Sequence, residues 1–173
     1  MDYKQTLNLP QTGFPMKAGL VEREPERLAR WYAEGIYERL RKRHAKAKET
    51  FVLHDGPPFA NGDVHIGTAL NKTLKDIILK FQTMRGKNVP YVPGWDCHGL
   101  PIEFKVVQEM RKEGRTDATS ADIRKACEAY AHKYIDIQRE QFKRLGVFGD
   151  WDNPSLTLDR KYEAEELRLF ADV

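Results

Sequence analysis

The sequence predicts an α/β protein that contains a parallel strand–helix–strand unit, several further helices and an extended amino-terminal arm. A short apolar run at 50–54 is bounded by turn residues, which is typical of a buried strand. A helical pattern follows over 66–84, and a second short apolar run lies at 88–92. This order and spacing imply parallel pairing through a right-handed crossover. Because two strands make a poor sheet, we expect the first half of a larger α/β domain.

The composition excludes several classes of protein. Hydrophobic residues make up 40% of the 173 residues and are spread along the chain, which argues against wholesale disorder. The 29 basic and 26 acidic residues nearly cancel, which excludes a histone-like coat for nucleic acid but leaves a local basic patch open. The two cysteines, Cys97 and Cys127, are too few for a disulfide framework or a four-thiolate zinc site.

Targeting signals are not evident in the sequence. The first residues, 1–5, lack the basic start and apolar run of a signal peptide. No stretch approaches the ~20 apolar residues that a membrane span needs. We therefore expect a reduced, soluble, cytoplasmic protein with no membrane partner.

The amino-terminal part is expected to form an arm and one helix. Residues 1–24 contain Pro10, Gly13 and Pro15 and show little periodicity, which predicts an extended arm. From Pro25, apolar residues fall at helical spacing, namely Leu28, Trp31, Tyr32, Ile36 and Leu40. The basic run 39–48 closes that helix and is best interpreted as a solvated helix end. The predicted organisation is therefore 1–48 as arm and helix, and 49–173 as the α/β part.

The remaining elements follow from turn residues and caps. Residues 55–63 form a loop rich in glycine and proline. The helix after it has one apolar face and ends at Gly86; that face comprises Ile66, Leu70, Leu74, Ile77, Ile78, Phe81 and Met84. Three helices are predicted beyond it. The first spans 102–113, and the second runs from a capping box at 119–122 to 145–146. The third spans 160–170 and is capped by Asp159.

Polar residues gather where such a sheet binds ligands. Ligands of parallel α/β sheets bind beyond the carboxyl ends of the strands, and the segments 55–68 and 93–101 lie at that edge. They and the strand end before them carry His54, Asp55, Asp63, His65, Asp96 and His98. A helix starting at His65 offers free N–H groups to a phosphate, although a capped helix with an incidental histidine stays an alternative. Neither a P-loop nor a dinucleotide fingerprint is present.

Taken together, these segments resemble the class I aminoacyl-tRNA synthetases. The resemblance to the first signature rests on 56–62 (Gly-Pro-Pro-Phe-Ala-Asn-Gly), 65–67 (His-Ile-Gly), and the pairs 71–72 (Asn-Lys) and 75–76 (Lys-Asp). Residues 93–103 resemble the second block of the isoleucyl, valyl and leucyl subgroup. Residues 3–10, 13–16 and 145–151 are similar to bacterial isoleucyl-tRNA synthetases, and Trp95 with 97–101 favours the isoleucyl group. The resemblance covers essentially the whole chain.

The resemblance implies a fold and a reaction. The fold is a Rossmann-like catalytic domain, of which this chain is expected to supply the first half as an amino-terminal piece. The reaction joins isoleucine to ATP, which binds with Mg²⁺, to give isoleucyl-adenylate, and then passes the acyl group to isoleucine tRNA. The family is usually monomeric, and zinc is expected only in a carboxy-terminal part that this chain lacks.

Roles carried over from the family fall on seven positions. Gly56 and Pro57 are expected to line the amino-acid pocket, and Asp96 to hold the substrate ammonium. As the catalytic pair, His65 and Thr68 would face ATP and stabilise charge on the α-phosphate. Two further residues complete the expected ATP site, Gly67 beside the adenine and Asn61 near the phosphates. No metal ligands are expected, because Cys97 and His98 lack partners at zinc spacing.

Two departures from the family pattern limit what the chain is expected to do. Thr68 stands where the first signature normally ends in histidine. The second, lysine-containing signature (Lys-Met-Ser-Lys-Ser), the editing insertion and the anticodon-binding domain are missing from these 173 residues, so we expect little or no activity from the chain alone. One alternative is a non-catalytic, synthetase-derived module that binds a nucleotide or regulates. Another is a small nucleotidyltransferase, against which the block 95–103 argues.

Overall fold

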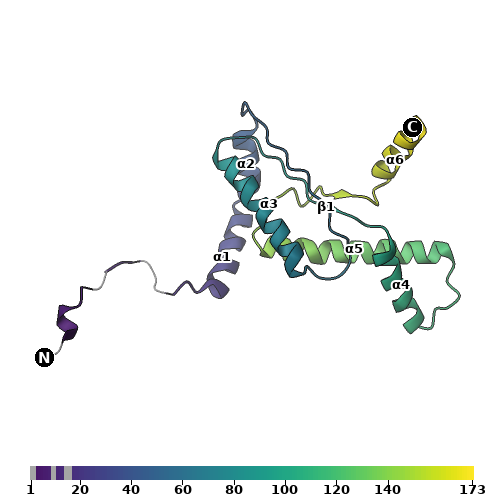
Figure 1. Ribbon diagram of the computed structural model, residues 1–173, viewed down its shortest axis with the longest axis horizontal. Coiled ribbons are helices and arrows are strands. Elements are labelled where there is room, and N and C mark those ends of the chain that lie inside the picture. The colour runs from purple at the N-terminus through teal and green to yellow at the C-terminus, as the bar shows by residue number, and fades with distance from the viewer. Residues whose placement is uncertain (1–2, 9–10, 14–16) are drawn as a thin grey trace.

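The computed structural model describes residues 3–8, 11–13 and 17–173. The expected arm motifs at 9–10 and 14–16 lie outside the described residues. Within the arm, Tyr3–Thr6 form a short 3-10 helix, η1, which lies apart from the rest of the described chain (Figure 1). The part that positions the candidate site therefore begins with the first α-helix.

The single helix expected from Pro25 to the basic run is wrong, because two helices occupy that stretch. Helix α1 spans Leu20–Ala33 and α2 spans Ile36–His44, so Pro25 lies inside α1 and the expected arm is shorter. The break falls at Gly35, whose φ of 57° is left-handed. Glycine adopts this conformation without the steric penalty that a β-carbon brings, so it allows the chain to leave the first helix and start the second.

Three extended segments run parallel at the centre, and the one at 88–97 lies in the middle. Strand β1 (Gly94–Trp95) pairs with β2 (Ser155–Leu156) in parallel register, a pairing that the sequence analysis missed. The predicted strands 50–54 and 88–92 do lie parallel, but only Thr50 and Asn88 form a bridge there. A second bridge joins Phe59 to Asp96. Prolines at 57, 58, 90 and 93 explain the gaps, since proline has no N–H to donate to a ladder.

The later helices agree with the sequence within two residues at each end. They are α3 (Ile66–Met84), α4 (Leu100–Lys112), α5 (Ser120–Arg144) and α6 (Arg160–Asp172). The capping box is confirmed, because the Thr119 hydroxyl accepts from the Asp122 N–H at 3.2 Å while the Asp122 carboxylate accepts from the Thr119 N–H at 3.0 Å. None of the described helices is long and apolar enough to cross a membrane.

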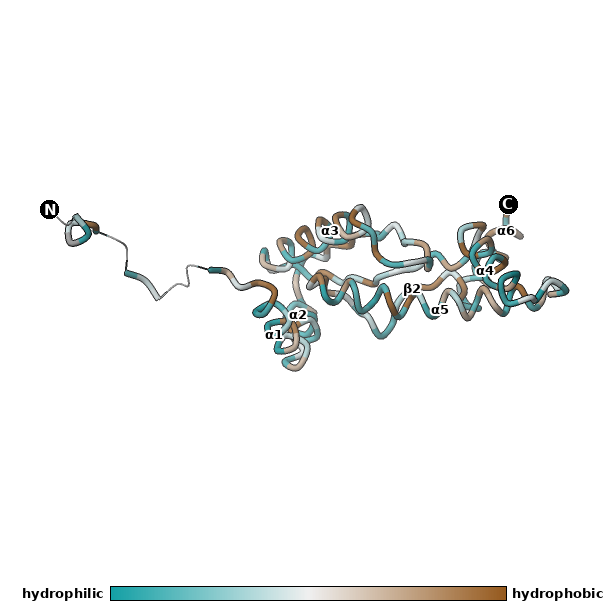
Figure 2. Tube along the Cα trace, turned by 90° about the horizontal axis from the view of Figure 1, so that it is seen from below, coloured by the Kyte–Doolittle hydropathy of each residue, from teal (hydrophilic) through white to brown (hydrophobic). Residues whose placement is uncertain are grey.

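The helices and the extended segments form three layers. Figure 2 shows α3 on one side of the central segments and α5 on the other. Buried rings fill the space beneath β1: Trp95 lies 6.4 Å from Phe142 of α5 and 6.2 Å from Trp151, between ring centroids. Helix α4 packs on α5 with Ile102, Val106 and Met110 buried. This packing holds β1 and α5 in a fixed relation.

The apolar face of α3 does not pack against the central segments. Its seven apolar side chains, identified above by their spacing, are between 43% and 87% exposed. The buried residues of α3 are instead Lys72, Asp76 and Leu79. Asp76 accepts from Lys80 at 2.6 Å and from the Phe148 N–H at 3.0 Å, so this polar residue has the partners that burial demands.

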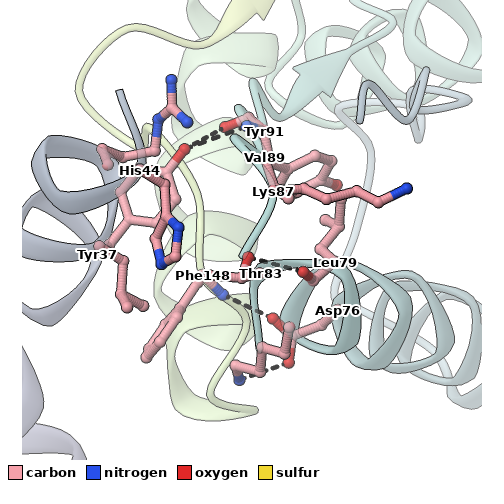
Figure 3. Close-up of a pocket in the computed structure, with 12 residues that line it drawn as sticks. Tyr37, His44, Asp76, Leu79, Thr83, Lys87, Val89, Tyr91 and Phe148 are labelled. Atoms are coloured by element: carbon pink, nitrogen blue, oxygen red, sulfur yellow. Dashed lines mark hydrogen bonds and ion pairs between the residues drawn. The ribbon is translucent and has the colours of Figure 1, made fainter. Parts of the chain in front are cut away.

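Helix α2 is fastened to the middle segment by a tyrosine. The Tyr37 hydroxyl donates to the Tyr91 carbonyl and accepts from the Tyr91 N–H, both at 3.1 Å (Figure 3). Burial is the main cause that raises the pKa of Tyr37. The cavity between α2, α3 and this segment measures about 20 Å³, which is room for about one water molecule. Helix α2 is therefore in contact with the 49–173 part, and the domain boundary at 48/49 stays a prediction.

Candidate functional site

The two segments singled out by the sequence meet through their backbones. The Asp96 N–H donates to the Pro58 carbonyl at 2.9 Å, and the Ala60 N–H donates to the Asp96 carbonyl at 2.8 Å. A methyl group on Gly94 would lie 3.5 Å from Pro57 Cβ, so this glycine is in close contact with the loop. The predicted amino-acid pocket residues are thus neighbours: Gly56 and Pro57 are exposed, and Asp96 is half-buried.

The Asp96 carboxylate caps a turn with one oxygen only. Its Oδ1 accepts from the His98 N–H at 3.2 Å. No described residue contributes a hydrogen bond to Oδ2. The His98 ring supports the same turn through a contact of 3.2 Å between Nε2 and the Thr157 carbonyl. Asp96 therefore serves the turn and still presents an oxygen that a cation can engage.

His65 is the N-cap of α3. Its Nδ1 accepts from the Gly67 N–H at 3.1 Å and from the Thr68 N–H at 3.3 Å. Because an N–H group can only donate, Nδ1 carries no proton, and Nε2 donates to Thr68 Oγ1 at 3.0 Å. The structure thus brings the predicted catalytic pair together. The His65 ring also accepts hydrogen bonds from two of the N–H groups that were expected to face a phosphate. This agrees with the alternative of a capped helix.

Gly67 has a local reason to be glycine. A methyl group there would lie 3.0 Å from His65 Cε1 and 3.1 Å from Nδ1. The absent side chain therefore leaves room for the His65 ring over the first turn of α3. The expected contact of Gly67 with adenine stays a prediction.

Asn61 braces the loop. Its Nδ2 donates to the Pro101 carbonyl at 3.1 Å, and its Oδ1 accepts from the Tyr130 hydroxyl at 2.9 Å. One side chain thus links the loop to α4 and to α5. The second N–H of the Asn61 amide has no hydrogen bond to a described residue, and the predicted place of Asn61 near the phosphates stays a prediction.

A buried ionic cluster under the loop was missed by the sequence analysis as a unit. Asp55 accepts from Lys72, from Lys75 at 2.6 Å and from the Tyr91 hydroxyl at 2.9 Å. The side chains of Asp55 and Lys72 are only 3% and 2% exposed. Because Asp55 immediately precedes Gly56, the cluster ties the start of the loop to α3.

The charges in this cluster are mutually dependent. Burial works against ionisation of Asp55, but the two lysines outweigh it and hold the pKa of Asp55 below its usual value. Burial lowers the pKa of Lys72, and the Asp55 carboxylate opposes that shift. For Tyr91, burial and then the neighbouring carboxylate raise the pKa of the phenol. Each charge is thus the other's partner, and removing either one would leave an uncompensated buried charge.

Two glutamines of α5 hold the end of the loop and were also missed. Gln141 accepts from the Val64 N–H at 2.8 Å and donates to Asp63 Oδ1 at 2.7 Å. Gln138 is 3% exposed and bonds to Phe59, Gly62 and Trp95. One signal was available, since Gln138 interrupts the apolar spacing of Ala131, Ile135 and Phe142. A polar residue in the apolar stripe of a helix is one that needs buried partners.

A larger cavity lies beside the second block. It measures about 490 Å³ between α4, α5 and the start of α6, and Cys97, His98 and Cys127 are among its lining residues. Burial raises the pKa of both cysteine thiols, which keeps them in the unreactive protonated form. Among the described residues, no group of three or more His, Cys, Asp or Glu side chains could hold a metal ion.

Similarity to known proteins agrees with the motifs. The family described as class I tRNA synthetases (I, L, M and V) matches residues 26–173. Isoleucine–tRNA ligases from Alkalilimnicola ehrlichii and Kosmotoga olearia are 60% and 56% identical over 99% of this chain. The ligase from Brachyspira hyodysenteriae is 54% identical over all of it. The chain spans about 18% of the length of each of these relatives.

A solved structure shows the same fold. The leucyl-tRNA synthetase agnB2 of Agrobacterium radiobacter K84, crystallised with tRNA and LeuAMS, superposes with a TM-score of 0.67 over 90% of this chain and 18% of its own. It is 23% identical, so the likeness concerns the fold alone. This confirms the predicted partial Rossmann-like α/β fold. From the matched family and from relatives above 50% identity, the chain belongs to the class I tRNA synthetases, in the group of the isoleucyl, leucyl, methionyl and valyl enzymes.

Proposed function

We propose that this chain supplies part of the isoleucine and ATP site of an isoleucine–tRNA ligase. In the complete enzyme an isoleucine carboxylate oxygen attacks the α-phosphorus of MgATP, and the bond to the β-phosphate side breaks, so that pyrophosphate leaves. A hydroxyl of the terminal adenosine of tRNA then attacks the acyl carbon, and AMP leaves. The reaction belongs in the cytoplasm, and the chain alone is expected to bind substrates rather than to turn them over.

One observation carries the proposal. The proposal is supported by the backbone pairing of Asp96 with Pro58 and Ala60, which makes Asp96 a neighbour of the loop that begins with the exposed Gly56–Pro57 segment, and by an Asp96 carboxylate oxygen that receives no hydrogen bond from a described residue. A carboxylate is suited to an ammonium group because a charge-assisted hydrogen bond contributes about 1.5–3 kcal/mol. Gly56 has open space where a side chain would lie, which leaves room for a substrate side chain.

At the start of α3, we propose that the His65 ring and a phosphate compete for the same donors. The Gly67 and Thr68 N–H groups are capped by His65 Nδ1 in this structure. A phosphate oxygen is a stronger acceptor for a helix start, because it carries the charge that the helix dipole favours. MgATP would then displace the ring from these amides, leaving the His65 ring and the Thr68 hydroxyl free to donate to the α-phosphate.

Titration of the Asp96→Asn variant tests the proposal. Isoleucine should bind more weakly by about 10-fold to 100-fold, because the charge of the carboxylate is lost. ATP should bind as before, because it has no ammonium group to meet Asp96. Asp150→Asn is the matched control, since Asp150 also caps a turn, through the Asn153 N–H at 3.2 Å, and has no assigned role in the site.

The outcomes separate the proposal from its alternative. Equal losses for isoleucine and ATP in the Asp96 variant would mean that Asp96 only shapes the turn. Binding of ATP with no response to any amino acid would favour the non-catalytic nucleotide-binding module.

A further inference from the structure

We propose that Gln138 of α5 is a positioning residue that holds the first signature loop and the second block at a fixed separation. Its effect on ligand binding rests on the function proposed above, whereas its effect on the loop can be measured without any ligand. Nothing in the signature motifs points to α5, since Gln138 lies 76 residues beyond Gly62 in the chain.

The amide of Gln138 is fully engaged, and its orientation is fixed by its partners. Oε1 accepts from the Trp95 indole N–H at 2.9 Å. Nε2 donates to the Gly62 carbonyl at 2.9 Å and to the Phe59 carbonyl at 3.1 Å. An indole N–H can only donate and a carbonyl can only accept, so the amide fits these three partners in one orientation only.

These partners belong to both halves of the candidate site. Phe59 pairs with Asp96 through the parallel bridge, and Trp95 directly precedes Asp96. Gly62 has a left-handed φ of 73°, at the turn that leads to His65 and α3. One buried side chain therefore bonds to the segment of the predicted ammonium ligand and to the loop before the predicted phosphate site.

Gln138 is held in place by burial, and its partners have few other hydrogen bonds. Gln138 is 3% exposed and lies on a 25-residue helix that is capped at its start. The Phe59 carbonyl also accepts from the Asn61 N–H at 2.8 Å. Within the described chain, the hydrogen bond recorded on the Gly62 carbonyl is that from Gln138. Loss of the amide would leave the Trp95 N–H unpaired in a buried place and the Gly62 carbonyl unpaired in a partly buried one, which is costly.

Two substitutions that nearly keep the shape of the glutamine side chain distinguish the contributions of its hydrogen bonds. Gln138→Glu keeps an acceptor for the Trp95 indole N–H but loses both donors and sets a carboxylate against two carbonyl oxygens. Gln138→Met loses all three hydrogen bonds. Asp76→Asn is the matched control. Asp76 belongs to the 75–76 pair of the resemblance, but it is a buried polar residue whose partners, Lys80 and the Phe148 N–H, lie outside both the loop 59–64 and the second block.

The experiment measures amide hydrogen exchange over 59–64, the indole N–H resonance of Trp95, thermal stability, and affinity for a non-hydrolysable isoleucyl-adenylate analogue. Both Gln138 variants should speed amide exchange over 59–64. They should also weaken binding of the analogue by about tenfold, the equivalent of one lost hydrogen bond. The Trp95 resonance should move in the Met variant and stay closer to wild type in the Glu variant. Asp76→Asn should change stability while it leaves exchange over 59–64 and affinity near those of the wild type.

Two results would overturn the inference: unchanged exchange over 59–64 in both Gln138 variants, or a loss of affinity no larger than in Asp76→Asn at equal loss of stability. A wild-type chain that does not bind the analogue would count against the proposed function instead. In that case the exchange data still decide whether Gln138 fixes the loop.

Discussion

At the scale of single residues, the N-cap role of His65 and its proposed role toward ATP can be separated by substitution. As N-cap of α3, its Nδ1 accepts from the Gly67 and Thr68 N–H groups. His65→Ala should therefore cost about 1 kcal/mol of unfolding free energy, whereas His65→Asn should cost much less, because asparagine is itself a good cap. If the ring also serves ATP, both variants should bind ATP more weakly. Urea unfolding beside ATP titration measures the two effects.

The asparagine variant decides between the two roles. Retained stability with weakened ATP binding means that the ring contacts the nucleotide. Retained stability with unchanged ATP binding would mean that His65 only caps the helix, and the catalytic assignment of His65 would then be wrong.

The Asp55 cluster makes the unfolding free energy depend on pH in the acidic range. Lysine partners hold the pKa of Asp55 below its usual value of 3.8, so the folded state favours the carboxylate. This contribution is fully present above the ordinary pKa and is lost as pH falls through the lowered one. Asp55→Asn leaves two lysines without their carboxylate and should cost about 3–5 kcal/mol at pH 7.

The gap between wild type and Asp55→Asn should therefore narrow as the pH falls from about 4 toward 2. Urea unfolding of both proteins across this range measures it. Tyr91→Phe is a milder companion, since it keeps the charges and removes only the hydroxyl, which donates to Asp55 at 2.9 Å and accepts from Lys72 at 3.2 Å. A gap that stays constant down to pH 2 would show that Asp55 does not stabilise the fold through its charge.

At the scale of elements, α3 presents its apolar face outward and its polar residues inward. Leu70 and Ile77 are 59% and 56% exposed, whereas Leu79 is 5% exposed. The double change Leu70→Gln/Ile77→Gln should move the unfolding free energy of this chain by no more than about 1 kcal/mol, as for surface positions. Leu79→Ala should cost about 2–5 kcal/mol, because it empties a packed position. A double variant as unstable as Leu79→Ala would show that the outward face is buried.

The elements that were predicted well have local causes. The α5 capping box and the end of α3 before Gly86 depend on neighbouring residues, and both agree with the structure. Two of the errors have tertiary causes: β2 exists through its pairing with β1, and the apolar spacing of α3 does not reveal which face meets the central segments. The break at Gly35 had a local signal, an isolated glycine within a helical pattern, that the apolar periodicity overrode.

At the scale of the whole molecule, the site could be predicted only in part. The two signature segments were expected to meet beyond the carboxyl ends of the strands at 50–54 and 88–92. They do meet, but because both continue as extended chain and pair side by side through Asp96 and Pro58, with Gly94–Trp95 itself forming β1. The bracing of the loop by Tyr130, Gln138 and Gln141 joins residues 69 to 79 positions apart. The place of Gln138 in an apolar stripe signals that it needs buried partners, but no local pattern identifies those partners, so they required the fold.

The central claim is that these residues form part of a site for isoleucine and ATP. Binding of this chain to non-hydrolysable analogues of all twenty aminoacyl-adenylates tests it most directly. The isoleucyl analogue should bind tightest, with the valyl analogue next and weaker by about 10-fold to 200-fold, the limit for one methylene group, for which isoleucine–tRNA ligases are themselves the reference example. Equal binding of all twenty analogues, or tighter binding of an analogue other than isoleucyl, would contradict the account.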